Sequence, residues 1–127
     1  MLEVEVIGEG GPEAPPRAEV ERLVGIAFGS AGVDEGHVAI EYVGAEKIAQ
    51  LNEEFRGTTG PTDVLSFPID QDAPAAGPRE LGDIVICPAH TEDLREAVLH
   101  GALHLTGMDH ETDDGEMLAL QAELLTW

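Results

Sequence analysis

The chain has few basic residues, few aromatic residues and a single cysteine. Six Lys and Arg residues stand against 26 Asp and Glu residues, which gives a formal net charge of −20 at pH 7. A surface of this charge repels polyanions at long range, so binding of nucleic acids through a broad basic face is disfavoured. Because Cys87 is the only cysteine, an internal disulfide is also excluded, and a reducing compartment is compatible. An anionic substrate must therefore be captured locally, by a metal ion or by individual arginines.

Long apolar runs are also missing. No stretch approaches the roughly 18 to 20 apolar residues that a membrane-spanning helix requires. The first residues, MLEVEVIG, alternate acidic and apolar side chains and lack the basic start of a signal peptide. We therefore expect a cytoplasmic protein with no membrane partner. The length of 127 residues suits one domain, which we place over residues 1–127.

The periodicity of apolar residues predicts an α+β fold. Strict alternation predicts strands, and apolar residues spaced three and four apart predict amphipathic helices. Strands are expected at residues 1–7, 37–43, 63–68 and 82–87, and helices between Pro16 and Gly32 and at residues 45–55, 91–106 and 113–125. The run IVI at residues 84–86 is typical of a central strand covered on both faces. The order βαβαββαα predicts a small mixed sheet of about four strands packed with helices.

The helix expected at residues 91–106 combines burial with two histidines. Thr91 is the expected N-cap, and Gly107 is expected to end the helix. Apolar residues lie on two opposite sides of this helix, a pattern typical of buried helices. His100 and His104 lie one turn apart on the remaining face. Because side chains at i and i+4 project side by side, both imidazoles can reach one metal ion.

A third histidine completes a known ligand spacing. His100, His104 and His110 follow the pattern H-x3-H-x5-H, with a glycine seven residues after the first histidine, as in the metzincin proteases. Three neutral nitrogens leave a fourth tetrahedral position to water, which is typical of a catalytic zinc site. We therefore predict one zinc ion per chain, held by these three residues. Asp109 and Glu111, which flank His110, are expected either to orient the ligands or to be solvated.

One residue separates this pattern from the proteases. Zinc proteases with an H-E-x-x-H motif use the glutamate beside the first ligand as the general base. Gly101 occupies that position here. Loss of a general base typically costs about 100- to 10,000-fold in rate. The spacing therefore predicts the metal geometry of the metzincins without their mechanism.

The same residues resemble the motifs of a known family. The segment HGALHLTGMDH (100–110) is similar to the HGxLHLxGxDH motif of the YbeY family, bacterial endoribonucleases of ribosomal RNA maturation. LNEEFRG (51–57) and PTDVLSFP (61–68) are similar to the family's LNxx(Y/F)RG and PTDVLSFP stretches, and LGDIVI (81–86) is similar to its LGDIxI strand. The segments occur in family order over about residues 45–120, so the resemblance covers most of the chain.

The resemblance implies a fold, a substrate and a set of site residues. It implies an α+β fold with a metal ion in a cleft, single-stranded RNA as substrate, and a role in small-subunit ribosomal RNA maturation and ribosome quality control. It places zinc on His100, His104 and His110, and a phosphate contact on Arg56. A guanidinium offers phosphate oxygens a planar fork of donors, although Arg56 could equally serve only as a cation at a helix C-terminus. Because basic residues are few, a ribosomal protein or another ribosome-associated partner could deliver the RNA.

Two alternatives to RNA cleavage remain open at this point. The chain could be a zinc hydrolase of another bond, peptide or ester, or a non-catalytic ribosome-associated module with a structural metal ion. Within the nuclease hypothesis the general base is also open, with the metal-activated water, a substrate oxygen and Asp109 as candidates. Asp63 and Ser66 are expected either to orient their strand against the site or to serve only the turn and the sheet.

Overall fold

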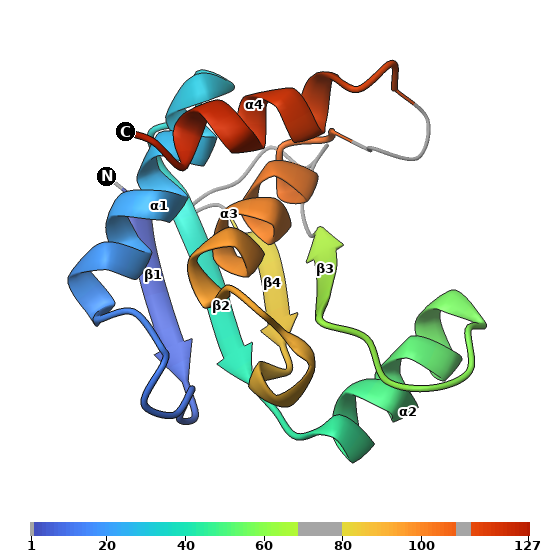
Figure 1. Cartoon of the computed structure of the whole chain (residues 1–127). Helices are drawn as coiled ribbons and strands as arrows, with labels where there is room; N and C mark the ends of the chain where they lie inside the picture. The colour runs from blue at the N-terminus through green and yellow to red at the C-terminus, as the bar shows by residue number, and fades with distance from the viewer. Residues whose placement is uncertain (1, 69–79, 109–112) are drawn as a thin grey trace.

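The computed structural model describes residues 2–68, 80–108 and 113–127 (Figure 1). Along these residues the elements follow the predicted order βαβαββαα. They are β1 (Leu2–Ile7), α1 (Arg17–Ser30), β2 (Gly36–Tyr42), α2 (Ala45–Arg56), β3 (Val64–Pro68), β4 (Glu80–Ile86), a short 3-10 helix (Pro88–His90), α3 (Leu94–Leu105) and α4 (Glu116–Leu124). None of the helices in the described ranges is long and apolar enough to span a bilayer.

The strands form one mixed sheet in the order β1-β2-β4-β3. β1, β2 and β4 run parallel, and β3 lies antiparallel to β4 at the edge. β4 has a partner on each side and is buried on both faces, with Ile84 and Ile86 in one core and Val85 in the other. The predictions of a mixed four-stranded sheet and of a central strand at residues 82–87 are therefore confirmed.

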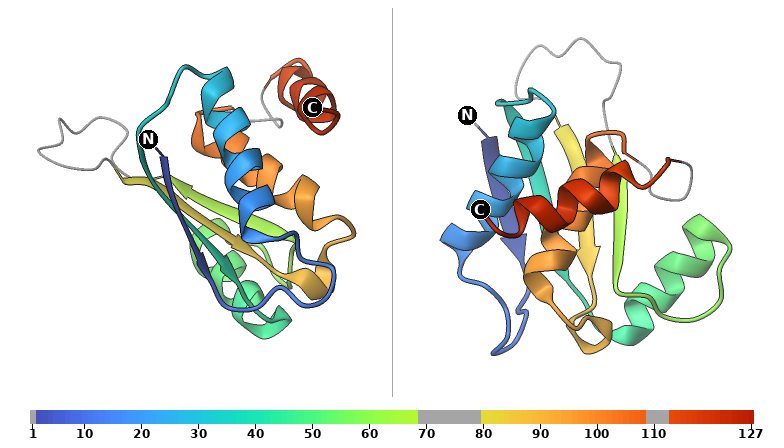
Figure 2. Two further views of the ribbon diagram at one scale, coloured as in Figure 1. Left: turned by 90° about the vertical axis from the view of Figure 1, so that its left-hand side faces the viewer. Right: turned by 45° about the horizontal axis from the view of Figure 1, so that its top comes forward.

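Helices cover the two faces of the sheet unequally. α1 and α3 lie across one face, α4 lies over them on the side away from the sheet, and α2 lies on the opposite face (Figure 2). The larger core fills the space between the sheet and α1, α3 and α4, and Met117 and Leu124 anchor α4 to it. The smaller core lies under α2 and contains Ile48, Leu65 and Val85. α3 is therefore enclosed between the sheet and other helices.

The N-cap of α3 differs from the prediction. Asp93, and not Thr91, caps the helix, because its carboxylate accepts the backbone N–H groups of Arg95 at 3.0 Å and Glu96 at 3.3 Å. The Thr91 hydroxyl is already used in the preceding turn, where it donates to the carbonyl oxygen of Cys87 at 2.7 Å. The helix therefore begins two residues later than expected.

The buried stripe predicted for α2 is also partly wrong. Ile48 is fully buried and Leu51 is partly buried, as expected, but Phe55 is 60% exposed. Phe55 belongs to the last turn of α2, and this turn extends beyond the edge strand β3 (Figure 1). Its ring touches only the neighbouring ring of Phe67 among the aromatic residues described, edge-to-face with centroids 5.2 Å apart.

Candidate functional site

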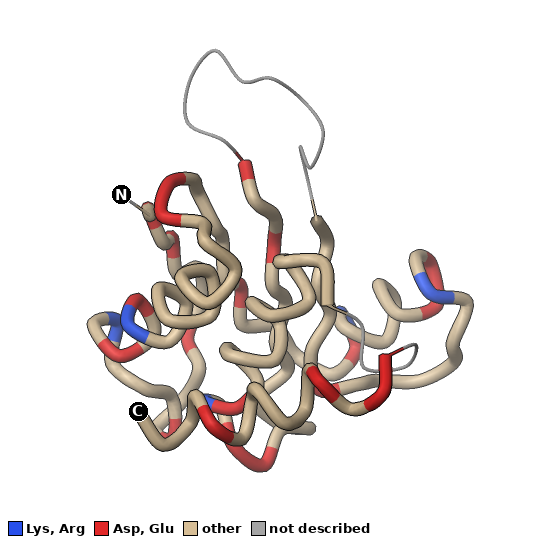
Figure 3. The backbone as a smooth tube through the Cα atoms, turned by 90° about the horizontal axis from the view of Figure 1, so that it is seen from above, with Lys and Arg blue, Asp and Glu red and all other residues tan. Residues whose placement is uncertain are grey.

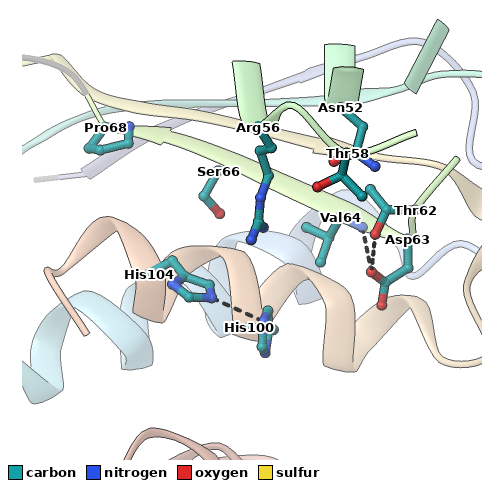
Figure 4. A pocket seen from close by; sticks show the side chains of 10 residues that line it. All are labelled: Asn52, Arg56, Thr58, Thr62, Asp63, Val64, Ser66, Pro68, His100 and His104. Carbon is teal, nitrogen blue, oxygen red and sulfur yellow. Dashed lines mark hydrogen bonds between the residues drawn. The ribbon is translucent and has the colours of Figure 1, made fainter. Parts of the chain in front are cut away.

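Two histidines, His100 and His104, lie on the partly exposed face of α3. Val98 and Leu103, on opposite sides of the helix, are both fully buried, which confirms the predicted burial of two sides. His100 and His104 are partly exposed and line a pocket of about 770 Å³ (Figure 4). The buried flanks hold the helix axis in place, so the two imidazoles cannot leave the pocket by rotation of the helix.

The two imidazoles converge on one point. The Nε2 atoms of His100 and His104 lie 3.2 Å apart, with ring centroids 4.7 Å apart. Each Nδ1 has a partner on the side away from the pocket: that of His104 lies 3.0 Å from the carbonyl oxygen of Met108, and that of His100 lies 2.7 Å from Oε1 of Gln121. These partners orient both rings so that their Nε2 atoms face each other.

The hydrogen bonds also indicate which ring nitrogens face a possible metal ion. The carbonyl oxygen of Met108 can only accept a hydrogen bond, so Nδ1 of His104 carries the ring proton. The amide oxygen of Gln121 also accepts, so Nδ1 of His100 carries the ring proton as well. In two neutral rings, the Nε2 lone pairs then face each other at 3.2 Å, a contact that a bound cation or one added proton makes favourable. Neutral imidazole with its second nitrogen held by an oxygen is the usual state of a zinc ligand. The donor set therefore fits a zinc ion.

The predicted third ligand, His110, lies outside the described residues, as do Asp109 and Glu111. Within residues 2–68, 80–108 and 113–127, no group of three or more His, Cys, Asp or Glu side chains is placed to hold a metal ion. Two of the three predicted ligands are therefore brought together, and the role of His110 stays a prediction.

Arg56 enters the same pocket from the opposite wall. It is the last residue of α2, and its side chain points across the pocket toward His100 and His104 (Figure 4). Gly57 ends the helix in the left-handed conformation, at φ 68°, and turns the chain away immediately after the arginine. The guanidinium therefore faces the imidazole pair, from an element more than forty residues away in sequence.

Gly101 sets the distance between the histidine helix and the sheet. A Cβ atom at this position would lie 2.5 Å from Cγ2 of Ile84 and 3.3 Å from Oγ of Ser66. The Ser66 hydroxyl donates to the carbonyl oxygen of Gly101 at 3.1 Å, which ties β3 to α3 directly behind the histidines. The position of the protease glutamate therefore faces the sheet and not the pocket, and no larger side chain fits there without moving α3.

The other walls of the pocket come from the loop between α2 and β3. Asn52 is buried, and its amide donates to the carbonyl oxygen of Gly60 at 2.9 Å, which folds the loop back onto α2. Asp63 accepts the backbone N–H of Val64 at 2.8 Å and the hydroxyl of Thr62 at 3.2 Å. Asp63 and Ser66 therefore both line the pocket and stabilise β3 and its turn, so the two roles expected for them are not alternatives.

A family model described as Endoribonuclease YbeY matches residues 14–127 of this chain. The chain belongs to the YbeY family. It is similar to the Endoribonuclease YbeY of Rubrobacter xylanophilus, with 42% identity over 132 residues that cover 96% of this chain and 93% of the relative. The protein of the same name from Salinispora tropica is 33% identical over 149 residues, covering 98% and 94%. The solution structure of TM1509 from Thermotoga maritima is similar with a TM-score of 0.53 and 27% identity, covering 96% of this chain and 86% of that one.

Acidic residues far outnumber basic residues along this YbeY chain, and Figure 3 shows both kinds on the backbone. Arg17, Arg22 and Arg95 form ion pairs with glutamates of α1. Among the described residues that line the pocket, Arg56 is the only one with a permanent positive charge. Among these residues, attraction of a polyanion into the pocket therefore depends on Arg56.

A second pocket limits the direction from which a polyanion can approach. This pocket, of about 470 Å³, adjoins the first at His100 and is lined in part by Asp63, Glu92, Asp93 and Glu96. Four carboxylates repel phosphate groups on this side of the histidine. In this YbeY chain, a polyanion therefore reaches the imidazoles most favourably from the side of Arg56.

A further charged cluster lies away from the pocket. His37 of β2 bridges the neighbouring strands, with Nδ1 2.8 Å from Glu80 on β4 and Nε2 3.2 Å from Glu5 on β1. The hydrogen bond that His37 donates to the Glu80 carboxylate is the main cause that raises the pKa of His37 above its ordinary value. Burial raises the pKa of Asp83, on the same part of β4. Protonated His37 therefore ties three strands together.

Gln121 is the site residue that sequence reasoning missed. It is 7% exposed on α4, and it is the partner that orients His100. The available signal was its position four residues after Met117 and three before Leu124, on the buried stripe of the last helix. A polar residue on such a stripe requires a hydrogen-bond partner, which points to a neighbouring polar side chain.

Proposed function

We propose that this chain is a zinc-dependent endoribonuclease that cleaves single-stranded RNA, in small-subunit ribosomal RNA maturation and ribosome quality control. The observation that carries the proposal is the convergence of two imidazole Nε2 atoms, 3.2 Å apart, in a pocket that Arg56 also lines. Membership of a family named for endoribonuclease activity supports the same reaction. Ribosomal proteins or a ribosome-associated partner are the further contacts we expect.

His100, His104 and His110 would hold the zinc ion. When bound, zinc supplies Lewis acidity toward a phosphoryl oxygen and makes a water molecule more acidic. Gln121 and the Met108 carbonyl keep the first two rings in the tautomer that leaves Nε2 unprotonated. Because these partners are already in place, the rings need little rearrangement to bind a metal ion.

Arg56 binds the phosphate group that reacts. Its guanidinium can donate two parallel hydrogen bonds to phosphate oxygens and keeps its charge in any environment. Charge increases on those oxygens as the phosphodiester is attacked, so the same donors stabilise the transition state more than the ground state. The left-handed turn at Gly57 and the buried amide of Asn52 hold the end of α2 where this contact is possible.

Peptide hydrolysis by the metzincin route is disfavoured. The position that carries the glutamate in those enzymes is Gly101, which packs against Ile84. Asp63 is the only carboxylate among the described residues of the Arg56 pocket, and it is engaged with Val64 and Thr62. The candidates for the general base of RNA cleavage are therefore still Asp109, a substrate oxygen and the metal-activated water.

Cleavage of single-stranded RNA by wild type, His104→Ala and Arg56→Ala tests the proposal. We expect kcat/KM to fall about 100- to 1,000-fold in Arg56→Ala, as for loss of one transition-state donor, and to fall to background in His104→Ala. Lys47→Ala is the matched control, because it removes one exposed positive charge from the same helix. The same RNA as a duplex and a casein substrate should be poor substrates. Equal cleavage of RNA by all four proteins would indicate a contaminating nuclease and refute the proposal.

A further inference from the structure

The second pocket directly adjoins the pocket of Arg56. Asp63, Val64 and His100 line both of them, and the second encloses about 470 Å³. Asp63 lies at the His100 end of the first pocket, away from His104 (Figure 4). The walls of the second pocket come from the start of β3, the segment from the 3-10 helix into α3, and α4. A ligand bound at the imidazoles therefore has a second cavity of small-molecule size beside it.

Gln121 places an unused donor in this second pocket. Its side chain is 7% exposed, its Oε1 is bound to Nδ1 of His100, and no hydrogen bond joins its Nε2 to a described residue. Among the described residues, the polar side-chain atoms that are enclosed and lack a partner are Tyr42 Oη and Arg95 Nε. Nε2 of Gln121 is not one of them, so it faces open space, and Gln121 lines the second pocket. An amide N–H on such a buried side chain requires an acceptor, which water or a ligand supplies.

Two glutamates supply the acceptors of this pocket. Glu92 and Glu96 are exposed and line it, and neither carboxylate has a hydrogen bond or ion pair with a described residue. The other two carboxylates are engaged, because Asp93 caps α3 and Asp63 holds the turn before β3. Leu118 of α4 is 47% exposed and adds an apolar surface. The pocket therefore offers free acceptors, a free donor and an apolar wall.

This set of groups restricts the chemistry of a ligand. Carboxylates repel phosphate groups. Ammonium and guanidinium groups only donate, so they suit the glutamates but leave Nε2 of Gln121 without an acceptor. A nucleobase has apolar faces and an edge with both donors and acceptors, and in a single strand this edge is unpaired. Adenine and cytosine carry an amino donor where uracil has a carbonyl oxygen. Because the free acceptors outnumber the free donor, the pocket suits an amino-bearing base better than uracil.

We propose that the second pocket is a subsite for one nucleobase of single-stranded RNA, and that it prefers an amino-bearing base to uracil. Glu92 and Glu96 accept the amino hydrogens, and Nε2 of Gln121 donates to the acceptor atom beside them. This proposal rests on the proposed function and adds to it the selection of a base near the phosphate that Arg56 binds. The backbone of the RNA stays on the side of Arg56, and only the uncharged base passes His100.

Cleavage of uridine strands that carry a single cytidine tests this preference. Cytosine and uracil differ little in size, so the substitution changes the hydrogen-bonding edge and leaves the phosphate charge unchanged. We expect cleavage at a constant distance from the cytidine, wherever it is placed, and roughly 5- to 150-fold faster than elsewhere, as for one good pair of hydrogen bonds. The double variant Glu92→Gln/Glu96→Gln should lose most of this preference, because carboxamides also donate to a uracil carbonyl oxygen. Glu123→Gln is the matched control, because Glu123 is exposed on α4 outside the pocket, and it should keep the preference.

Nucleoside binding detects the subsite without cleavage and without any phosphate group. The side-chain amide signals of Gln121 are assigned in the NMR spectrum of ¹⁵N-labelled protein by their loss in Gln121→Met. We expect cytidine to shift these signals to saturation and uridine to leave them nearly unchanged. Spermidine, a cation whose ammonium groups only donate, serves as the comparison. Thermal unfolding of each variant identifies any loss of folding.

The outcomes separate the two proposals. If wild type fails to cleave RNA, the proposed function fails, and a saturable shift with cytidine still supports the subsite. If wild type cleaves RNA without regard to the cytidine and no nucleoside shifts the Gln121 signals, the subsite is wrong. A shift with spermidine and none with cytidine would also overturn it, because the pocket would then hold a cationic group. So would a double glutamate variant that cleaves every strand faster and keeps the preference for cytidine, because the carboxylates would then only repel phosphates.

Discussion

Replacing Gly101 with alanine tests whether the close contact between α3 and the sheet positions the histidines. The added Cβ atom would lie 2.5 Å from Cγ2 of Ile84, below the 3.0 Å that real Cβ contacts essentially respect. Ile84 is fully buried, and its branched side chain has a restricted χ1, so it cannot rotate away. α3 must therefore move away from β4, and it carries His100 and His104 with it.

Two opposing effects determine the magnitude. Alanine in place of glycine in a helix interior stabilises by about 1 kcal/mol, and overpacking of a buried contact destabilises by about 1–3 kcal/mol. Gly25→Ala is the matched control, because Gly25 lies within α1 and a Cβ there would meet nothing within 4 Å. The control should gain about 1 kcal/mol. The difference between the two variants then isolates the packing cost, about 1–3 kcal/mol.

Urea denaturation followed by circular dichroism measures both free energies of unfolding. RNA cleavage by the same preparations measures the consequence for the site. We expect Gly101→Ala to lose activity although every predicted metal ligand is present, and Gly25→Ala to keep it. If both glycine variants were stabilised equally, α3 would not be held against Ile84 as described, and the reasoning would be refuted.

Two further predictions concern the partners of histidines. Gln121→Met should weaken zinc affinity by roughly 10- to 100-fold, the typical cost of losing a hydrogen bond that orients a ligand. Competition with a fluorescent chelator measures the zinc affinity. Gln50→Met, at an exposed position, is the control and should leave the zinc affinity unchanged. For His37, Glu80 raises the folded-state pKa above 6.5, so its stabilisation is fully present below pH 6.5 and is lost as pH rises through the folded-state pKa. The stability difference between wild type and His37→Gln should therefore be larger at pH 5.5 than at pH 9, by up to about 1 kcal/mol for these partly exposed pairs; an equal difference at both pH values would contradict the ion pairs.

Local patterns predicted most of the fold. Alternation identified the four strands, and the apolar run at residues 84–86 identified the central one, because a strand covered on both faces has no polar side. The errors lie where two local solutions compete. Thr91 and Asp93 are both good caps, and only the use of the Thr91 hydroxyl in the preceding turn decides between them. Phe55 fits the apolar stripe of its helix, but it lies in the last turn and is 60% exposed.

For the candidate site, too, some features followed from local sequence and others only from the tertiary structure. The sequence by itself determined that His100 and His104 lie side by side on one face of a helix, since the periodicity of a helix follows from consecutive residues alone. Only the tertiary structure decided that Arg56 faces them, that Gln121 orients one of them, and that Gly101 lies against Ile84. Such contacts depend on strand order and on which helix faces are buried together. Those arrangements minimise the exposed apolar surface of the whole chain, and no single segment encodes them.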